Sequence, residues 1–590
     1  MFNRPLLAQN DSNKEKREEE IGNGREVYKY KYNYPSLNGV AMADGVPHSE
    51  LPHFEWTVRL GAVLGSLIKN LVEEELTHKK KEILLEWEII SDILKSTISH
   101  NDIDKLEKLL RLFKTDNSSK DVDSLDAYND YFEEFDIPSI AKNFQEDEAF
   151  VARRVAGQNP VVIESITDAT EHFPLSNEVF QSILGFEDDT LELAGAHQRL
   201  YMIDYKALKG IKNGKNKIGD KYSYAPKALF ALVKDNQNTS KSLRPIAIIC
   251  GQKSDDENPI FTPHDGYAWE IAKTIIEIAD LNHHELVSHL AGTHLLIEPF
   301  VVTTHRQFAD RHPLKVLLVP HFEGTIFINW GAEKHLVNDG GKFDELFSGT
   351  MDTNRAVVAK RLRQSFNHSM LPYELEQRGV KSKKLFYPYR DDASKIWIAI
   401  GEWVDSYLSL YYKSDSDVIE DIELQSWVTE LISEGRVCGF GEDDKGKMTT
   451  FAYLKEVVTM LIFTSSAQHA SVNFTQKEFA GYPPNMPAAG YTPAPKDKNK
   501  SKEDWFKLLP PVSKSDSQIN LMQLLSDINY TTLGKYGWFY FWDWNIFMAL
   551  LKFKLSLRKI EKEIKKRNRE EELFIYEYLL PSRIPQSINV

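Results

Sequence analysis

The sequence predicts a mainly α-helical protein with a few short strands, on the basis of three observations. Apolar residues recur at three- and four-residue steps from Trp56 to about Phe113, which is typical of helices that bury one face. From Trp269 onward, long helical patterns dominate the chain. Stretches with strand character are short and few, and Pro245 to Ile249 is an example. With 590 residues, 42% of them hydrophobic and 27% charged, the chain can build a large core.

We expect three regions along the chain. Residues 1–50 form an N-terminal arm, in which a charged run from Lys14 to Glu20 precedes an alternating stretch from Val27 to Tyr34. The alternation predicts an edge strand or an extended segment that lies on the body. Residues 51–150 form a helical N-terminal extension, acidic and rich in loops from residue 114 onward. Residues 151–590 form the main domain.

The extension carries one strongly periodic apolar stripe. We interpret this stripe as the buried face of a core helix. The alternative is a face that docks on a membrane, because Arg59 and Lys69 flank it. The stripe consists of Leu60, Val63, Leu64, Leu67, Ile68 and Leu71.

Composition argues against several classes of protein. A net charge of −15 disfavours nucleic acid as a partner, because phosphate contacts need a basic surface. The two cysteines, Cys250 and Cys438, exclude a disulfide framework and a site built on several thiolates, and they fit a reducing compartment. No apolar stretch is long enough for a secretory signal or a spanning helix, so the expected location is the cytoplasm.

Two further elements are expected in the last hundred residues. Residues 488–503, which contain Pro, Gly and Lys, predict an exposed loop. A helix from about Trp544 to Arg569 ends in a heavily charged, solvated face. For the aromatic cluster at its start, core packing is the expected role and a membrane-surface patch is the alternative. The cluster consists of Trp538, Phe539, Tyr540, Phe541, Trp542 and Trp544.

Four histidines lie within twelve residues, at positions 283, 284, 289 and 294, inside an apolar helical pattern. A zinc hydrolase would need two histidines four residues apart, with an intervening glutamate as base. Here His284 and His289 are five apart, which in a regular α-helix turns the two rings about 140° away from each other. A π-helical turn would bring them together. The spacing therefore argues against a metalloprotease and for a different metal-binding helix, and it equally allows His289 with His294.

A second segment offers more ligands. His469 and Asn473 are four residues apart, so they face the same way on a helix. The chain ends in the apolar segment Arg583 to Val590, whose α-carboxylate could be buried. Nitrogen and oxygen donors without thiolates suit six-coordinate iron or manganese better than structural zinc.

Several ordered motifs make the chain similar to the lipoxygenase family, the non-heme iron dioxygenases of polyunsaturated fatty acids. The resemblance covers residues 150 to 590 and implies a large helical catalytic domain built around two long central helices. The motifs are Gln158-Asn159-Pro160, Trp269-x-x-Ala272-Lys273, His284-x4-His289-x4-His294, Glu298-Pro299-Phe300, His312-Pro313, Pro320-His321, Leu336-Val337-Asn338, His469-Ala470-x-Val472-Asn473-Phe474 and Ile584-Pro585-x-Ser587-Ile588.

The resemblance implies a role for each candidate residue. The metal ligands would be His284, His289, His469, Asn473 and the terminal carboxylate of Val590, which hold the metal-bound hydroxide that abstracts hydrogen. His294 would be a nearby non-ligand histidine, and His283 would be structural or would contact the ligands from behind. Gln476 would support the metal site from outside the ligand shell. In the substrate pocket, Leu336 and Leu525 would grip the reacting carbon, Ala332 would bear on stereochemistry, and Leu346 and Phe347 would lie near the limit of pocket depth.

The implied reaction is dioxygenation of a cis,cis-1,4-pentadiene in linoleate, linolenate or arachidonate, with O2 as co-substrate and a hydroperoxide as product. The chain ends in valine where the family usually has isoleucine, so the resemblance allows either iron or manganese as the metal. The helical pattern of residues 1–150 is similar to the shorter bacterial members, in which helices replace an N-terminal β-sandwich domain. The alternatives are a manganese enzyme with bis-allylic or hydroperoxide-isomerase products and an inactive lipid-binding protein. Peripheral membrane contact through the Leu60 to Leu71 helix is a further expectation.

Overall fold

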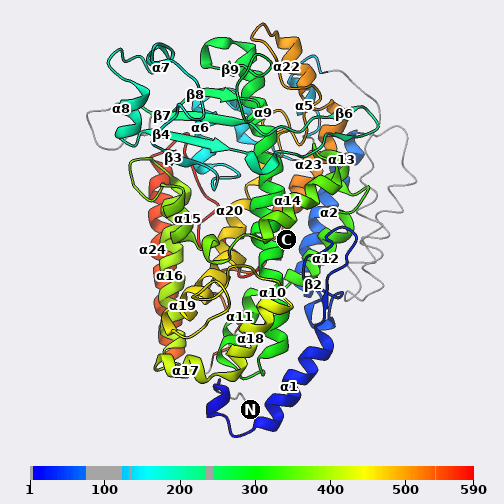
Figure 1. Cartoon of the computed structure of the whole chain (residues 1–590). Coiled ribbons are helices and arrows are strands. Elements are labelled where there is room, and N and C mark those ends of the chain that lie inside the picture. The colour runs from blue at the N-terminus through cyan, green and yellow to red at the C-terminus, as the bar shows by residue number, and fades with distance from the viewer. Residues whose placement is uncertain are drawn as a thin grey trace.

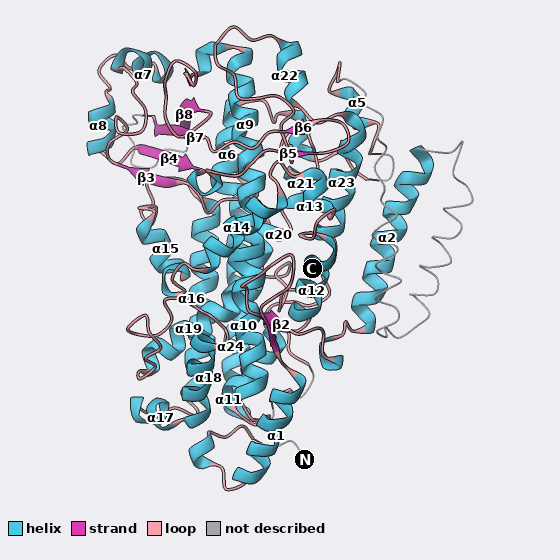
Figure 2. Cartoon of the chain, turned by 45° about the vertical axis from the view of Figure 1, so that its right-hand side comes forward, coloured by secondary structure: helices cyan, strands magenta, loops and turns pink. Residues whose placement is uncertain are grey.

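The computed structural model describes residues 4–74, 122–132, 135–233, 243–537, 540–541 and 543–589. A small β-sheet with short helices occupies one end, and a body of long helices extends from it (Figure 1). The described residues of the last segment run into the middle of the helical body in both views (Figure 2). The mainly helical fold with few strands, predicted from the sequence, is confirmed.

The helices are α1 (Lys14–Val27), α2 (Phe54–Glu74), α5 (Asp126–Asn129), α6 (Asp147–Ala156), α7 (Asn177–Leu184), α8 (Leu191–Ala196), α9 (Tyr267–His283), η6 (His284–His294), α10 (Leu295–Gln307), α11 (Pro313–Leu318), α12 (Thr325–His335), α13 (Lys342–Leu346), α14 (Met351–Leu362), α15 (Leu371–Gln377), α16 (Pro388–Leu408), α17 (Asp415–Glu420), α18 (Ile422–Ser433), α19 (Phe451–Phe463), η9 (Thr464–Gln468), α20 (His469–Asn473), α21 (Gln476–Phe479), α22 (Lys502–Leu508), α23 (Val512–Ser526) and α24 (Trp544–Arg569).

The main sheet has five antiparallel strands in the order β3-β4-β7-β8-β9. The predicted strand at Pro245 to Ile249 lies within β8, which pairs with the fully buried central strand β7. Two small ribbons, β1 with β2 and β5 with β6, complete the strands of the described residues. The strands are β1 (Tyr30–Lys31), β2 (Met42–Ala43), β3 (Glu164–Ile166), β4 (Leu200–Asp204), β5 (Gly214–Lys215), β6 (Asp220–Lys221), β7 (Lys227–Leu232), β8 (Leu243–Ile249) and β9 (Ile260–Phe261).

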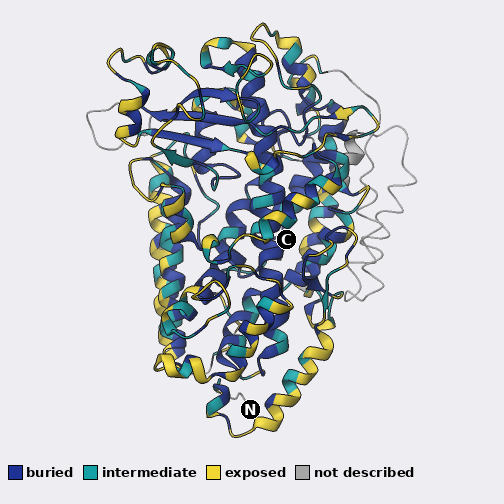
Figure 3. Cartoon of the chain, in the orientation of Figure 1, coloured by how far each residue is buried: buried dark blue, intermediate teal, exposed yellow. Residues whose placement is uncertain are grey.

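Two long central helices form the core of the body. Helices α9, η6 and α10 join into one helix from Tyr267 to Gln307, and α19, η9 and α20 join into a second from Phe451 to Asn473. The first is long and apolar enough to cross a membrane by length and composition, but 83% of its most apolar stretch is buried inside the protein. Figure 3 shows both helices as buried ribbon at the centre of the molecule, so they are core helices.

Buried ion pairs fix the first central helix against α6. Arg154 lies 2.6 Å from Glu277 and 2.9 Å from Asp280, and Arg153 lies 2.8 Å from Glu277. All four side chains are almost fully buried. Removing one partner would leave an uncompensated charge in the core, so this cluster fixes how α6 meets the helix that carries the histidines.

The N-terminal arm differs in part from its prediction. The charged run is the start of helix α1, which continues to Val27, and only Tyr30 and Lys31 of the alternating stretch form a strand. Alternation over so few residues cannot compete with the helix that precedes it. The arm packs on the body through Arg17, whose buried guanidinium lies 2.7 Å from Glu423 on α18.

In the extension, the stripe on α2 faces the core as predicted. Leu60, Leu64 and Leu67 are buried in a cluster with Phe327 and Ile528, and Val63 is partly buried beside them. The membrane interpretation of this face is therefore wrong for these residues. The side chains of Ile68 and Leu71, and residues 75–121, lie outside the described part.

Candidate metal centre

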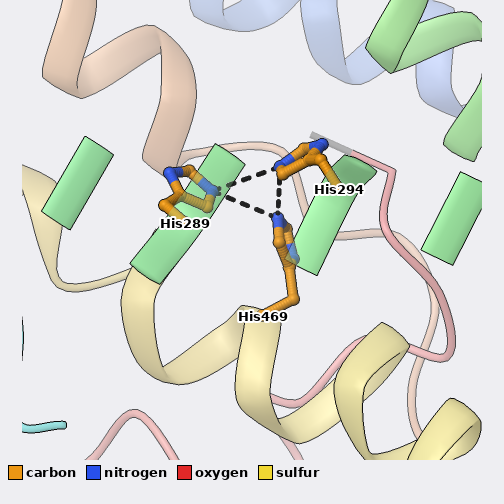
Figure 4. Close-up of side chains that lie close together, drawn as sticks. All are labelled: His289, His294 and His469. Atoms are coloured by element: carbon orange, nitrogen blue, oxygen red, sulfur yellow. Dashed lines mark hydrogen bonds between the residues drawn. The ribbon is translucent and has the colours of Figure 1, made fainter. Parts of the chain in front are cut away.

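Three imidazoles converge at the point where the two central helices meet. Their Nε2 atoms form a small triangle: His289 to His294 measures 3.2 Å, His294 to His469 3.1 Å, and His289 to His469 3.4 Å (Figure 4). Nitrogens about 2.1 Å from one ion lie about 3.0 Å apart at octahedral angles and about 3.4 Å apart at tetrahedral angles. The triangle therefore fits one metal ion bound by three imidazoles.

Oxygen atoms beside the outer nitrogens of two of these rings fix the tautomers of the rings. Nδ1 of His294 lies 2.8 Å from Oδ1 of Asn329, and Nδ1 of His289 lies 3.3 Å from Glu285. A neutral imidazole carries one N–H, and an oxygen acceptor draws that proton to Nδ1. Nε2 then presents its lone pair to the centre. Burial also lowers the pKa of His294 to about 3, which keeps it neutral.

The amide of Asn329 is itself held in orientation. Its Nδ2 donates to Oε2 of Glu298 at 2.8 Å and to the carbonyl of His294 at 3.1 Å, which leaves Oδ1 to accept from the histidine. Burial raises the pKa of Glu298 to about 7. Asn329 and Glu298 thus form a second layer behind His294.

The predicted π-helical turn is confirmed. Residues His284–His294 form a π-helix, as do Thr464–Gln468 just before His469. In a π-helix, residues five apart lie above one another, so the rings of 284, 289 and 294 line up on one side. Their successive centroids are 5.4 and 4.9 Å apart. The five-residue spacing that excludes a zinc peptidase helix is what this geometry requires.

The structure reverses the predicted roles of His284 and His294. Nε2 of His284 lies 2.7 Å from the carbonyl oxygen of Val472, so it carries a proton and has no lone pair for a metal. Its Nδ1 lies 3.1 Å from the Gln158 amide nitrogen. The assignment of His294 as the non-ligand histidine is therefore not supported, because His294 completes the triangle with His289 and His469.

Glu285 lies between two of the histidines. Its carboxylate oxygens are 3.1 Å from His284 and 3.3 Å from His289, and these three groups make a second set that could hold a cation. Burial raises the pKa of this carboxyl, but His284 and His289 outweigh that effect and lower the pKa to about 2. Nδ1 of His284 accepts from the Gln158 amide, and Nδ1 of His289 carries the proton that it donates to Glu285, so neither nitrogen offers this second set a lone pair; the carboxylate therefore orients His289.

Asn473 and Gln476 form a chain of amides beside the triangle. Asn473 lies one turn after His469 on the same short helix, and its Nδ2 donates to the carbonyl of Leu525. Gln476 donates from Nε2 to Asn473 Oδ1 at 3.0 Å, which is the supporting contact expected of it. Its own Oε1 has no hydrogen-bond partner among the described residues.

The chain just before Val590 is anchored in the same region. The carbonyl of Asn589 accepts from the Trp56 indole at 2.8 Å, and the carbonyl of Ile588 lies 3.4 Å from the hydroxyl of Thr325. Both residues are buried. Val590 lies outside the described residues, so its carboxylate as a ligand stays a prediction.

A cavity of about 960 Å³ reaches the triangle. His289 and His294 lie in its wall, together with Leu336, Leu525 and Ala332, so these three predicted pocket residues do line it. Leu346 and Phe347 do not; they pack in the core beside Phe343, whose ring lines the cavity and contacts Phe347. Their predicted role at the depth limit is not supported.

Glu285 and Asn329 are functional candidates that sequence reasoning missed. Glu285 had a usable signal, because it lies four residues before His289 on the same helix. Asn329 had none: it is thirty-five residues from His294 along the chain. Only the packing of α12 against α10 brings the two together.

A mainly helical protein with a buried cluster of three histidines on two interrupted helices has the kind of site that non-heme metalloenzymes use. The family model described as Lipoxygenase matches residues 52–575. The chain is 36% identical to linoleate 9/13-lipoxygenase of Pseudomonas aeruginosa, over 96% of this chain and 89% of that protein. It is similar to the crystal structure of a coral 8R-lipoxygenase, with a TM-score of 0.83, 28% identity and coverage of 100% of this chain and 83% of that one.

A solved lipoxygenase in complex with arachidonate is equally similar, with a TM-score of 0.83, 28% identity and coverage of 100% of this chain and 84% of that one. The chain therefore belongs to the lipoxygenase family and is a fatty-acid dioxygenase. The family binds a non-heme metal, and the histidine cluster is a site that could hold one.

Proposed function

We propose that His289, His294 and His469 hold iron, with Asn473 and the carboxylate of Val590 completing the ligand set. The observation that supports this most strongly is the triangle of three Nε2 atoms, two of them turned inward by oxygens behind their rings. Manganese is the alternative, because both ions accept nitrogen and oxygen donors. When bound, such an ion supplies the one-electron oxidation that takes hydrogen from the activated CH2 group of a 1,4-diene.

The surrounding residues keep this donor set in place. Glu285 and Asn329 hold the rings of His289 and His294 with Nε2 unprotonated, which also raises the basicity of the ligands. Gln476 orients Asn473 while leaving it able to bind, because an amide oxygen has two lone pairs and the hydrogen bond uses one.

We propose that the substrate is a polyunsaturated fatty acid whose carboxylate lies at the Lys514 end of the cavity. One face of α23 lines the cavity along its length and changes from polar to apolar: Lys514, Ser517 and Asn520 are followed by Leu521, Leu524 and Leu525, and then by Ile528 just beyond the end of the helix. A charged head followed by a hydrocarbon tail matches this order. The exposed Lys215 and Lys217 lie at the polar end, and Trp56, Leu60 and Leu64 close the apolar end.

The length of α23 supports this orientation. Lys514 and Leu525 are eleven residues apart, which spans about 16 Å of helix. An extended chain advances about 1.2 Å per bond, so a carboxylate at Lys514 places the chain about thirteen bonds away beside Leu525. That is the region of linoleate in which the diene lies. Leu336 and Leu525 would then hold the reacting carbon in one position, which limits reaction to one carbon among several similar ones.

Oxygen uptake tests the activity. With linoleate, metal-loaded protein should consume O2 and produce the ultraviolet absorbance of a conjugated diene, whereas oleate, which lacks the 1,4-diene, should give neither. Absence of both signals with protein of full metal content would favour the inactive lipid-binding alternative. Elemental analysis of the same sample decides between iron and manganese, and product chromatography detects bis-allylic or isomerised products.

The carboxylate contact is tested separately with Lys514→Gln. This variant should raise the KM for linoleate about tenfold and leave the KM for methyl linoleate unchanged, since only the free acid carries the charge; about 1.4 kcal/mol corresponds to tenfold. Lys507→Gln, on the exposed side of the neighbouring helix α22, is the control. Equal effects on acid and ester would refute the contact without affecting the proposal for the metal.

We also propose that the enzyme acts in the cytoplasm. The support is the pair of thiols: Cys250 is buried, Cys438 is exposed, and neither forms a disulfide. Fractionation of the source cells, with the protein followed by antibody, tests this location; recovery from a secreted or oxidising fraction would contradict it.

A further inference from the structure

Helix α24 presents an apolar face to solvent, which we name the α24 stripe. Its members are large and well exposed: Trp544 (71%), Phe547 (50%), Met548 (46%), Leu551 (39%) and Leu555 (53%). They recur at three- and four-residue steps, so they form one continuous line over the first three turns of the helix. A contiguous line of this kind, unlike a scattered surface leucine, marks an interaction site.

The stripe is not the side by which α24 packs on the protein. The opposite face of the helix holds its buried residues, which anchor it to α16 and the rest of the body: Ile546, Phe553, Leu557, Ile560 and Ile564. When a helix has apolar residues on two opposite sides and only one side packs on the body, the other side stays exposed to solvent. The stripe therefore needs a partner outside the fold.

The same exposed face turns basic in the second half of the helix. Continuing the helical steps beyond Leu555, the solvent side carries Arg558, Lys559, Lys562, Lys566 and Arg569. None of these five has a carboxylate within 4.0 Å among the described residues, whereas Lys552 and Arg567 pair with Glu402 and Asp392 on α16. Helix α24 has nine Lys and Arg residues and two Glu residues, in a chain whose net charge is −15.

We propose that this face docks the protein on a lipid bilayer that contains anionic lipid. A helix that lies at a membrane interface combines Trp, Phe and Leu on one surface with Lys and Arg close by, and α24 has both in sequence along one face. Anionic head groups would attract the basic half, and the apolar half would enter the interface. An acidic chain cannot bind such lipid over its whole surface, so attachment needs a local basic region.

Other occupants match this face less well. Nucleic acid would engage the basic half but leave five apolar side chains in water. A second copy would bring the apolar halves together, but a stable protein interface buries about 800 Å² on each partner, and five partly exposed side chains supply less. A membrane would contact both the apolar and the basic half of this face, and it does not require a surface of complementary shape.

The location of α24 is compatible with catalysis. It runs along an outer edge of the body (Figure 1), and its apolar start follows Asp543, which pairs with Arg4 near the N-terminus. Besides the histidine helix η6, the helices that line the cavity include α2, α12 and α23, which lie on the other side of the central helices from α24. Docking through α24 would hold the enzyme at a lipid surface and leave the cavity unobstructed.

Vesicle flotation of the full chain tests the proposal, with phosphatidylcholine alone and with phosphatidylcholine mixed with phosphatidylglycerol. The unaltered protein should partition at least tenfold better to the mixed vesicles, and added salt should reduce the difference. Phe547→Ser with Leu551→Ser should lower partitioning roughly tenfold or more, because the apolar contact is lost. Lys559→Glu with Lys562→Glu should also lower partitioning roughly tenfold or more, but only to the mixed vesicles.

Two matched controls alter exposed residues elsewhere: Leu193→Ser on α8 and Lys383→Glu before α16, and both should bind as the unaltered protein does. Oxygen uptake with dissolved linoleate should stay within about twofold in all variants, which shows that they fold. As a second readout, brominated lipid should quench the tryptophan fluorescence of the unaltered protein more than that of the Trp544→Phe variant. The proposal would be overturned if the Phe547/Leu551 variant and the Lys559/Lys562 variant both bound vesicles as well as the unaltered protein, and also by dimerisation that depends on Phe547 and Leu551 without any lipid binding.

Discussion

An oxygen atom behind each ring decides which nitrogen of His289 and His294 faces the centre. Without Glu285 and Asn329, either imidazole could place its proton on Nε2, and the triangle would then present N–H groups instead of lone pairs. Two buried acceptors therefore set the chemistry of the site before any ion binds. The corresponding hydrogen bond of His284 is on the opposite nitrogen, toward the carbonyl of Val472.

This difference predicts opposite outcomes for two histidine substitutions. His294→Gln should lose most of its bound metal, because one of three imidazole ligands is gone. His284→Gln should keep most of the metal, because it loses only a hydrogen bond to the protein, although a destabilisation of about 1–3 kcal/mol is expected from the buried partner left behind. Elemental analysis of the purified proteins measures the metal, and thermal unfolding measures the stability. A metal-free H284Q together with metal-loaded H294Q would restore the assignment made from the sequence.

Glu285→Gln tests the orienting carboxylate. The amide keeps an acceptor near Nδ1 of His289 but removes the charge, so the affinity for metal should fall about 10- to 100-fold, as for other residues that orient a ligand from behind. Competition with a chelator measures the affinity. Glu270→Gln, a partly buried glutamate earlier on the same helix, is the control and should leave the affinity unchanged. An unchanged affinity in E285Q would show that His289 does not depend on this contact.

At the scale of elements, the π-helix could be predicted from the sequence, whereas the choice of ligands within it could not. Three histidines spaced five residues apart can share one side of a regular helix only if that helix is a π-helix, and residues His284–His294 form one. Which two of the three face His469 depends on how the second helix approaches. The carbonyl of Val472 on that helix takes His284 out of the ligand set, and no property of residues 284–294 alone indicates this.

Gly292 lies within the π-helix, where there is no room for a side chain. A Cβ added there would lie 2.8 Å from the carbonyl oxygen of Val287, its neighbour five residues earlier. Gly292→Ala should therefore destabilise the protein by about 1–3 kcal/mol and lower its metal content. Gly331→Ala on α12 is the matched control: its Cβ would meet nothing within 4 Å, and alanine favours a helix, so stability should be unchanged or slightly higher. Equal unfolding temperatures for the two variants would contradict the role of Gly292.

Over the whole molecule, much of the architecture could be predicted from the sequence and some of it could not. Helix α24 has the predicted limits, Trp544 and Arg569, because its apolar period is long and regular. The exposed α24 stripe was foreseen only at Trp544, where a membrane-surface patch was the alternative to core packing. A helical period shows which residues share a face but not which face the body covers. The alternating stretch from Val27 to Tyr34 was also ambiguous, because so few residues fit an edge strand and an extended segment equally.

Buried histidines make the stability of the whole molecule depend on pH. His321 is fully buried between the carbonyl of Gln586 and the hydroxyl of Tyr536, and burial lowers its pKa to about 4. Below pH 6.5 the unfolded chain binds a proton here that the folded chain does not. The contribution of His321 is therefore present above about pH 6.5 and is lost as the pH falls toward 4, by up to about 1.4 kcal/mol per pH unit.

His321→Gln should remove this part of the pH dependence. Its unfolding free energy, measured with denaturant from pH 7 to pH 4, should change less steeply than that of the unaltered protein. Burial raises the pKa of the Asp392 carboxyl to about 6, which has the opposite effect on the pH dependence of stability. Both proteins contain Asp392, so its effect cancels when they are compared. Parallel curves over the whole range would show that His321 titrates alike in the folded and unfolded states.

The central claim is that one metal ion binds between His289, His294 and His469, and X-ray diffraction from crystals of the metal-loaded enzyme tests it most directly. Data collected on either side of the iron and manganese absorption edges should give a single anomalous peak about 2.0–2.3 Å from the three Nε2 atoms, and the edge at which it appears identifies the element. A peak between His284, Glu285 and His289, or crystals of active enzyme with no peak at the triangle, would contradict the account.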